Sequence, residues 1–446
     1  MLEKSVITFK KEYNMIELKG EFNKDCKIFI DEIENEALSL IYGILNTKEF
    51  ANVPIRIMPD THCGKDIVIG FTSPIVNAIN PSHVGVDIGC TITTCITDTS
   101  INESDFPLIE HRIKKTIPMG FNIHSVNKCD EKDLFKFLRG EYNKARSSWP
   151  EMIQDIDINE RYISSLLKKI NMDEGVFYKS IGTVGGGNHF IEIGNCNGKY
   201  AFTVHCGSRN FGNKVCLYWS KIASSSQIDK KILKDKINHL KKNCSDKKML
   251  PQLIEQLKIE EQNKVCSNGY LTGENMSGYL TDMVIAQAYA KYNHKIICAY
   301  IAEIFTQLYN SKIVETIQSI HNYVDIAGDH MIRKGAIRAY ENEKMVVPFN
   351  MRDGLAICVG KSNPEWNFSC SHGAGRKLSR SKAKEELSLE MFKDTMKNVY
   401  STSICYNTLD ESPMAYKDTE TIIDRIKDTC DILYMIQPLI NIKAVD

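Results

Sequence analysis

A carboxylate and a thiol lie three residues apart at Asp87 and Cys90, inside the glycine-containing apolar run Val84–Cys90. Carboxylate oxygen and thiolate sulfur both bind metal ions, and a thiolate can bridge two cations. Three segments place an imidazole after a strand-like run and beside Gly, Asn or Ser, and these carry His189, His205 and His321. A lone histidine is more often a hydrogen-bonded core residue. Because this context recurs, we predict a metal centre, and thiolate with imidazole alone favours zinc or iron.

His372 is the candidate nucleophile. It lies between small residues in the segment Ser371–Arg376. An unprotonated imidazole nitrogen can attack phosphorus to give a phosphoramidate, provided that an acceptor holds the other ring nitrogen. Asp60 is the candidate acceptor. The same imidazole is also compatible with the role of a general base or of a further metal ligand.

Two glycine-rich segments predict a bound phosphate or nucleotide. Gly185–Asn188 can form a nest of backbone N–H donors, and Gly373 and Gly375 would let the backbone approach a phosphate closely. Arg209 and Arg376 supply forked donors for phosphate oxygens. Neither segment has the spacing of a Walker loop or of a dinucleotide-binding fingerprint. For either segment alone, a tight turn would be the default interpretation.

The composition is that of an ordinary globular protein. The chain has 446 residues, 43% hydrophobic and 25% charged, so it can bury a large core. Its 56 basic and 56 acidic side chains cancel, so a polyanionic partner must be bound by a local patch. We find neither a secretory signal nor an apolar run of membrane-spanning length, and no CxxC pair among the 15 cysteines. We therefore expect reduced thiols, no membrane association and a cytoplasmic location.

The elements that must position these groups alternate between strand-rich and helical blocks. We predict a strand at 26–30, a helix at 31–45, buried strands over 55–97, helices over 104–172 and 214–308, strands over 311–385, and helices with a short terminal strand over 386–446. The buried strands over 55–97 would include the run that carries Asp87 and Cys90.

The candidate groups are spread from Asp60 to Lys443, which favours one catalytic domain over separable ones. We predict a single α+β domain, residues 1–446, with central β-sheets and helical excursions at about 104–172 and 214–308. The segment 229–248 has eight lysines and three aspartates. We interpret it as a solvated helical hairpin rather than an element that lies along an RNA backbone.

Taken in order, the motifs resemble those of the RtcB family of RNA ligases. The resemblance covers the chain from about Arg56 to Lys443. It rests on MPDTHCGK, VGVDIGC, GTVGGGNHFIE, HCGSR, HNYVD, RKGA, NMRDG, NPEWN, SHGAGRKLSR and DESPMAYKD. One of these motifs would be weak, whereas the ordered set is highly specific.

This resemblance implies a GTP-dependent ligase that uses two Mn²⁺ ions, so manganese replaces the zinc or iron favoured by ligand chemistry. Cys90 would bridge the ions, with His205 and His321 on one and Asp87 and His189 on the other. His372 would be guanylylated, Asp60 would orient it, and Arg209 would assist as a catalytic residue. The guanylate pocket would comprise Asn188, Phe190, Glu192, His372, Gly373, Ala374, Gly375, Arg376, Tyr416 and Lys443.

The implied substrates are RNA ends with a 2′,3′-cyclic phosphate or 3′-phosphate and RNA ends with a 5′-hydroxyl. The cyclic phosphate would be opened, the 3′-phosphate capped with GMP from histidine, and the GMP displaced by the 5′-hydroxyl, in RNA repair or tRNA splicing. An archease-like activator is a possible partner. Two other classes stay open, a metal-dependent phosphoesterase acting on RNA ends and a non-catalytic RNA-end-binding protein.

Several residues depart from the usual family pattern. Thr91 follows Cys90 where glycine is common, His83 precedes the metal motif where a small residue is common, and Cys206 replaces a frequent serine. None of these changes removes an implied ligand or the nucleophile. They leave open an additional thiol or imidazole near the metal ions.

Overall fold

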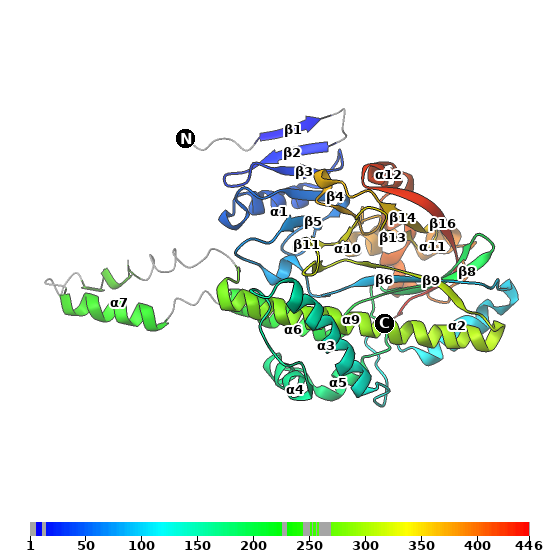
Figure 1. Ribbon diagram of the computed structural model, residues 1–446. Coiled ribbons are helices and arrows are strands. Elements are labelled where there is room, and N and C mark those ends of the chain that lie inside the picture. The colour runs from blue at the N-terminus through cyan, green and yellow to red at the C-terminus, as the bar shows by residue number, and fades with distance from the viewer. Residues whose placement is uncertain are drawn as a thin grey trace.

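The computed structural model describes residues 6–10, 15–224, 230–243, 250–251, 253–255, 257 and 269–445. Figure 1 shows β-sheets above the long helix α9 (Gly273–Tyr309), with α3 (Glu131–Ser148), α4 (Glu160–Lys169) and α5 (Glu174–Lys179) gathered below it. The smaller helices α1 (Asn35–Leu45) and α12 (Thr419–Arg425) lie beside the sheets, and the predicted α+β class is confirmed.

One large sheet carries the N-terminal strands. Its order is β1-β2-β3-β4-β5-β11-β10, with β3 and β4 parallel and the other neighbours antiparallel. The strands are β1 (Val6–Lys10), β2 (Met15–Lys19), β3 (Cys26–Ile28), β4 (Ile55–His62), β5 (Ile69–Pro74), β10 (Tyr323–Val324) and β11 (Met331–Lys334). The end of β4, where Asp60 lies, departs from regular pairing with β5.

The second large sheet is antiparallel, in the order β13-β14-β16-β7-β8-β6-β9. The strands are β6 (Thr91–Thr97), β7 (Phe190–Cys196), β8 (Lys199–Cys206), β9 (Ile313–Ile320), β13 (Lys344–Asn350), β14 (Gly354–Gly360) and β16 (Cys430–Ile442). Its edge strands approach each other, since Val346 N on β13 donates to Ser319 Oγ on β9 at 2.8 Å. The sheet is thus curved almost into a barrel. A small sheet pairs β12 (Ala336–Arg338) with β15 (Ser369–Ser371).

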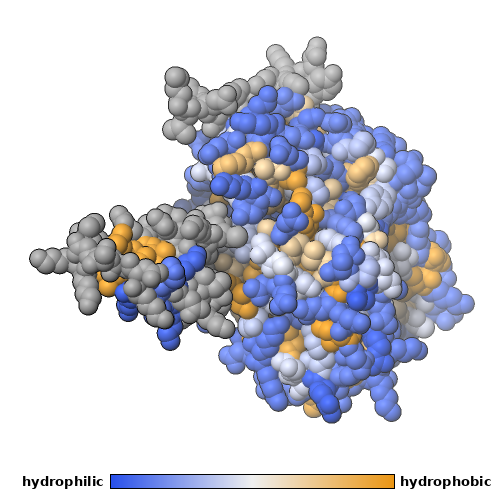
Figure 2. Space-filling view, turned by 60° about the vertical axis from the view of Figure 1, so that its left-hand side comes forward, coloured by the Kyte–Doolittle hydropathy of each residue, from blue (hydrophilic) through white to orange (hydrophobic). Residues whose placement is uncertain are grey.

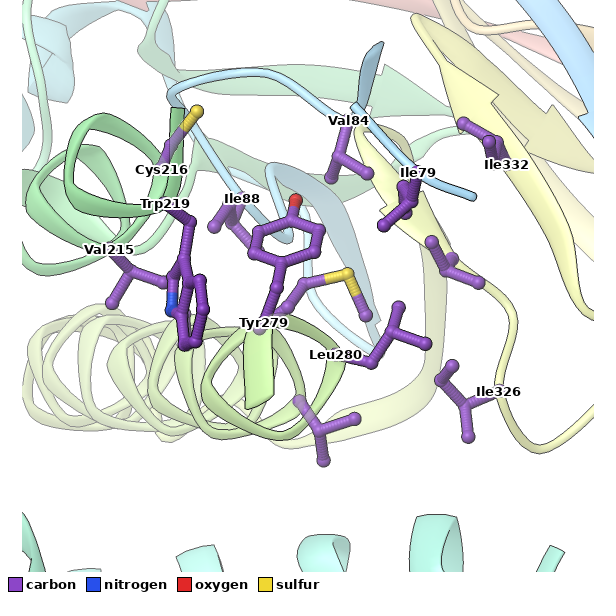
Figure 3. Packing of buried hydrophobic residues seen from close by; sticks show 14 of the residues in the cluster. Ile79, Val84, Ile88, Val215, Cys216, Trp219, Tyr279, Leu280, Ile326 and Ile332 are labelled. Atoms are coloured by element: carbon purple, nitrogen blue, oxygen red, sulfur yellow. The ribbon is translucent and has the colours of Figure 1, made fainter. Parts of the chain in front are cut away.

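Helices cover the sheets and carry much of the core. Besides those named above, they are α2 (Phe106–Thr116), α6 (Arg209–Ser224), α7 (Lys230–Asn243), α10 (Arg380–Glu386) and α11 (Leu389–Thr395). Helix α9 is buried along most of its first half, including Tyr279 and Leu280. Figure 3 shows these two side chains packed beside Trp219 of α6 and beside Val84 and Ile88. Burial of such side chains is worth about 1.5–3 kcal/mol each and anchors the loop that holds the predicted metal ligands.

That loop is not a strand, so the prediction of a buried strand at Asp87 and Cys90 is wrong. The short 3-10 helix Pro81–His83 leads into turns, and β6 begins at Thr91. Gly85 and Gly89 have φ angles of 106° and 69°, which a strand does not allow. Val84 and Ile88 of the run are buried in the core, whereas Val86 is exposed, so the apolar composition resembles that of a strand although the backbone does not form one.

Three elements differ in smaller ways from the predicted secondary structure. The first helix begins at Asn35 rather than Asp31, because Glu34 is still extended. His189 precedes strand β7 instead of following a strand. The terminal strand β16 is 13 residues long rather than short, and its Pro438 lies at a register shift, where a missing N–H is tolerated.

The lysine-rich segment is helical where it is described. Helix α7 projects from the body in Figures 1 and 2, and its Lys234, Lys236 and Lys241 are exposed. Residues 229 and 244–248 of the predicted hairpin lie outside the described residues. In the described part of the chain, we find no helix with the length and apolarity that a bilayer crossing requires.

Candidate metal centre and nucleotide-binding cavity

A cavity of about 1010 Å³ opens where the two large sheets and the small sheet meet. This volume is at the upper end of the range for small-molecule sites, so it can hold a nucleotide together with part of a second substrate. Its walls include most of the residues predicted for the metal centre and the guanylate pocket, namely Asp87, Cys90, Asn188, Phe190, Glu192, His205, His321, His372, Gly373, Ala374, Gly375, Arg376, Tyr416 and Lys443.

Strand register brings the thiol and two imidazoles together. Strand β6 lies between β8 and β9, and Thr91 is opposite both Cys206 and Ile320. Cys90 is therefore opposite the residue after β9, and His321 N donates to Cys90 O at 2.8 Å. On β8, His205 is opposite Phe190, the first residue of β7, which places the preceding His189 at the same edge.

The glycine-rich loop then turns Asp87 toward the same point. Cys90 N donates to Asp87 O at 3.2 Å. Gly207 allows the carboxylate to approach, since a Cβ there would lie 2.1 Å from Asp87 Oδ1. Gly185 does the same for His189, where a Cβ would lie 2.1 Å from Nδ1.

The ligand atoms form a compact cluster. Cys90 Sγ lies 3.4 Å from His189 Nε2 and 3.2 Å from His205 Nε2. His189 Nε2 lies 2.9 Å from Asp87 Oδ2. His205 Nε2 is also 3.2 Å from His321 Nε2. The sulfur of Cys90 and one nitrogen each of His189 and His205 thus lie within 4.8 Å of one another. Asp87 and His321 lie beside this group.

Hydrogen bonding fixes a metal-binding tautomer for His205. Its Nδ1 faces the carbonyl of Asn188 at 3.1 Å and must donate, so its Nε2 carries a lone pair directed at Cys90 and His321. Burial lowers the pKa of both His205 and His321, which keeps these imidazoles neutral. The Nδ1 atoms of His189 and His321 are buried and have no partner among the described residues. Neutral, converging lone pairs fit a bound cation.

The protein without metal holds its thiol protonated. Burial raises the pKa of Cys90, and the nearby Asp87 raises it further. For Asp87, burial acts to raise the pKa, but the adjacent His189 outweighs it and brings the pKa to about 2. A cation at the cluster would reverse the preference of the thiol and bind a thiolate.

His372, directly after β15, and Asp60, on β4, form a dyad. His372 Nδ1 lies 2.6 Å from Oδ2 of the fully buried Asp60. The same oxygen accepts from the backbone N–H groups of His372 and Gly373 at 3.1 and 3.2 Å. An ionised carboxylate accepts all three bonds, so Nδ1 carries the proton and Nε2 presents a lone pair to the cavity. Gly375, at φ 73°, permits this approach, because a Cβ there would lie 2.1 Å from Asp60 O.

A buried carboxylate organises the predicted guanylate pocket. Glu411 accepts from Tyr416 Oη at 2.7 Å and from Lys443 Nζ at 3.2 Å, and it pairs with Arg376 at 3.3 Å and with Arg380 at 2.8 Å. Burial acts to raise the pKa of Glu411, but the three cations lower it to about 2. The carboxylate therefore stays ionised and holds the basic side chains in place.

The aromatic and acidic side chains of this pocket also have defined partners. Lys443 Nζ lies 5.5 Å from the centre of the Phe190 ring, and the Arg376 guanidinium lies 5.2 Å from that of Tyr416. Glu192 is buried against Asn441, whose side chain donates to it at 2.8 Å. Burial raises the pKa of Glu192 to about 8, so its carboxyl group is mostly protonated at neutral pH.

Arg209 lies close to His189, since an added Cβ at Gly185 would lie 2.7 Å from Arg209 Nη1 and 2.1 Å from His189 Nδ1. Its Nε donates to Thr183 at 3.0 Å and its Nη2 to the carbonyl of Gly120 at 2.7 Å. It does not line the cavity described above. The guanidinium thus holds the two loops that flank His189 together.

The three departures from the family pattern point away from the metal cluster. Thr91 donates its hydroxyl to Gly89 O at 2.8 Å. Cys206 follows His205 on β8, faces the other side of the sheet, and contacts Asn293 at 3.5 Å. His83 is buried among aromatic rings that include Phe50, and burial lowers its pKa to about 3. These residues are core packing and add no ligand to the cluster.

Sequence reasoning overlooked two residues that the structure places at the site, Glu411 and Lys417. Lys417 Nζ donates to Pro59 O at 2.9 Å and to Thr61 O at 2.6 Å, on either side of Asp60. Both residues belong to the motif DESPMAYKD, so the signal was present. Lys417 directly follows the predicted Tyr416, but its contacts are with Pro59 and Thr61, which lie far away in the sequence.

The chain is similar to known proteins over most of its length. Residues 45–444 match the family described as tRNA-splicing ligase RtcB. The RNA-splicing ligase RtcB of Escherichia coli strain K12 is 28% identical over 410 residues, which cover 87% of this chain and 90% of that protein. RNA-splicing ligase RtcB homolog 2 of Entamoeba dispar is 24% identical over 94% of this chain and 87% of its own length. The tRNA-splicing ligase RtcB of Archaeoglobus fulgidus is 22% identical over 82% of each chain. With the family match covering most of the sequence, this chain belongs to the RtcB family.

Proposed function

We propose that this protein is an RNA ligase that joins 2′,3′-cyclic phosphate or 3′-phosphate ends to 5′-hydroxyl ends, using GTP and two Mn²⁺ ions. The observation that carries the proposal is the position of His372, whose free Nε2 faces the cavity that also holds the Cys90 cluster. The ring centroids of His372 and His321 are 4.8 Å apart. A nucleophile beside a metal centre and a basic pocket is the arrangement that nucleotidyl transfer requires.

The Cys90 cluster would hold the metal ions. Cys90 would bridge them, with His205 and His321 on one side and Asp87 and His189 on the other. The ions would neutralise phosphate charge during nucleotidyl transfer. The neutral imidazoles and the fixed tautomer of His205 support this assignment.

His372 would carry the covalent step. Its Nε2 forms a bond to the α-phosphorus of GTP as the bond to pyrophosphate breaks. Asp60 keeps Nδ1 protonated and stabilises the positive charge that the ring acquires. An oxygen of the RNA 3′-phosphate then attacks the same phosphorus, which breaks the N–P bond and restores the imidazole. The 5′-hydroxyl of the second RNA end finally displaces GMP.

The pocket around Glu411 would bind the guanylate. Arg376 and Lys443 supply positive charge, and Phe190 and Tyr416 supply aromatic walls. The mostly protonated carboxyl group of Glu192, together with Asn188, offers groups that can hydrogen-bond to a base or a phosphate. Arg209 would contribute to catalysis by holding the loop of His189 rather than by contacting phosphate.

The test is incubation with Mn²⁺ and GTP labelled on the α-phosphate. We expect an acid-labile covalent GMP adduct that His372→Ala abolishes. His111→Ala is the matched control, because His111 lies on the exposed face of α2, outside the cavity. A folded protein that acts on RNA ends but never forms the adduct would favour the phosphoesterase, and one that binds RNA ends without acting on them would favour the binding protein.

We extend the proposal to the cellular context. A cytoplasmic location suits a site that needs Cys90 reduced, and the described cysteines are unpaired with one another. Broken or spliced RNA, including tRNA, is the proposed substrate class, with an archease-like protein as a possible activator.

A further inference from the structure

A second imidazole reaches the cavity beside the nucleophile. His62 is the last residue of β4 and lines the same cavity as His372. It lies two residues after Asp60, and it is opposite Ile69 in the ladder with β5. Ile69 reaches the site of Gly335, where an added Cβ would lie 2.1 Å from the Ile69 side chain and 3.3 Å from His372 Cε1. The two imidazoles therefore share one wall.

The protonation state of His62 is fixed by its surroundings. Its Nδ1 lies 3.0 Å from the carbonyl of Asp60, which can only accept, so Nδ1 carries the proton. Its Nε2 is left with a lone pair and has no hydrogen-bond partner among the described residues. Burial lowers the pKa of His62 to about 4, which keeps the ring neutral near pH 7.

Lys417 fixes the end of β4, which carries His62. Its Nζ donates to the carbonyls on both sides of Asp60, and its backbone N–H donates to Gly375 O at 3.0 Å. One residue thus fixes β4 relative to the loop after His372. An exposed imidazole on a mobile loop would not be held in this way, so His62 is positioned for contact with a bound molecule.

The proposed reaction contains a step that needs a base. Attack by His372 Nε2 and attack by an anionic RNA phosphate use existing lone pairs, whereas a 5′-hydroxyl must lose a proton as it attacks. Asp60 is completely buried and does not line the cavity, so an incoming hydroxyl does not reach it. His62 offers a neutral nitrogen on the cavity wall.

We propose that His62 is the general base of the sealing step, an inference that rests on the ligase function proposed above. As the 5′-oxygen forms a bond to the 3′-phosphorus of the GMP-capped RNA, its O–H bond breaks and the proton passes to His62 Nε2. The bond between that phosphorus and the oxygen of the leaving GMP breaks at the same time. The products are a 3′,5′-phosphodiester, GMP and a protonated His62, which returns its proton to solvent.

The experiment separates sealing from the earlier steps. GMP-capped RNA is isolated from a wild-type reaction and then joined to a second strand in a single turnover with His62→Asn. Asparagine can keep the donor to the Asp60 carbonyl but has no nitrogen at the place of Nε2. We expect adduct formation from GTP within about 3-fold of wild type and sealing slower by about 10²-fold, the usual contribution of a general base. His111→Asn is the matched control.

A strand that ends in a 5′-thiol gives a readout that a structural role would not move. A thiol ionises near neutral pH and needs little help from a base, so the sealing deficit of His62→Asn should fall to within about 5-fold with this strand. The inference is overturned by normal sealing, by an equal deficit with both strands, or by loss of adduct formation in the variant. A wild-type protein that forms no adduct and seals no RNA would instead remove the proposed ligase function itself.

Discussion

Replacing Asp60 with asparagine tests the dyad that the proposed function requires. The carboxylate accepts from His372 Nδ1 at 2.6 Å and from two backbone N–H groups, and it is completely buried. Asparagine is nearly isosteric and can keep one oxygen in place. The substitution therefore removes charge with little change in volume, which makes the expected effect electrostatic.

The magnitude can be bracketed from this geometry. In the ground state, a hydrogen bond to a charged group is worth about 1.5–3 kcal/mol and a neutral one about 0.5–1.5, so the His372 bond loses roughly 1–1.5 kcal/mol. During attack on GTP the ring becomes positive, and a unit charge about 4 Å away contributes about 4 kcal/mol at an effective dielectric constant of 20. Because about 1.4 kcal/mol is tenfold in rate, Asp60→Asn should slow adduct formation by about 10-fold to 10³-fold.

Single-turnover transfer of label from GTP to the protein measures this rate directly. GTP is kept saturating, so that binding in the pocket around Glu411 does not limit the signal. Thermal unfolding of the same preparation shows that the variant is folded. Adduct formation within 3-fold of the wild-type rate would refute the reasoning, because His372 would then react without a charged partner.

Four further substitutions follow from the site. Cys90→Ser should lose tightly bound metal, which elemental analysis after dialysis measures. Retention of two ions by this variant would contradict a bridging thiolate. Cys206→Ser is the control and should keep the metal ions, because Cys206 faces the other side of β8. The pKa of Glu192 is raised from 4.5 to about 8, so its ionisation destabilises the folded protein increasingly as the pH rises from 4.5 to 8. Glu192→Gln should lack this loss of stability, which is on the order of 1–3 kcal/mol. Denaturant titrations of both proteins at pH 5 and pH 8.5 measure the difference. Lys417→Met should lower the free energy of unfolding by about 1–3 kcal/mol, because two carbonyls beside Asp60 lose their donor, and an unchanged denaturation midpoint would contradict this.

The candidate metal ligands can be predicted from the sequence because the same local pattern surrounds several of them. The sequence predicts Cys90 and the histidines as ligands because a thiol, an acid and imidazoles occur near glycine, asparagine or serine in several segments, and the structure brings these groups together. The α+β class also followed from the alternation of strand-rich and helical blocks. Both inferences depend on local composition, which a single sequence contains.

The backbone conformation of Val84–Cys90, by contrast, cannot be predicted from its local composition. A strand would place Val84, Val86 and Ile88 on one face, whereas this loop buries Val84 and Ile88 and leaves Val86 47% exposed. The positive φ at Gly85 and Gly89 produces this difference. Glycine permits that conformation without requiring it. The core contacts of Val84 and Ile88 with α9 decide the outcome, and those contacts lie about 200 residues away in the chain.

Long-range pairing explains why Glu411 was missed although its motif was noticed. Its partners are Arg376, Arg380, Tyr416 and Lys443, which β16 and the loop after β15 bring to one pocket. The predicted short terminal strand would not have delivered Lys443 there. Because β16 runs from β14 across to β7, it carries Lys443 back to the carbonyls of Gly187 and His189, at 3.2 and 3.4 Å. The last strand thus connects the proposed guanylate pocket to the loop of His189, a proposed metal ligand, so a change in the pairing of β16 should disturb both sites together.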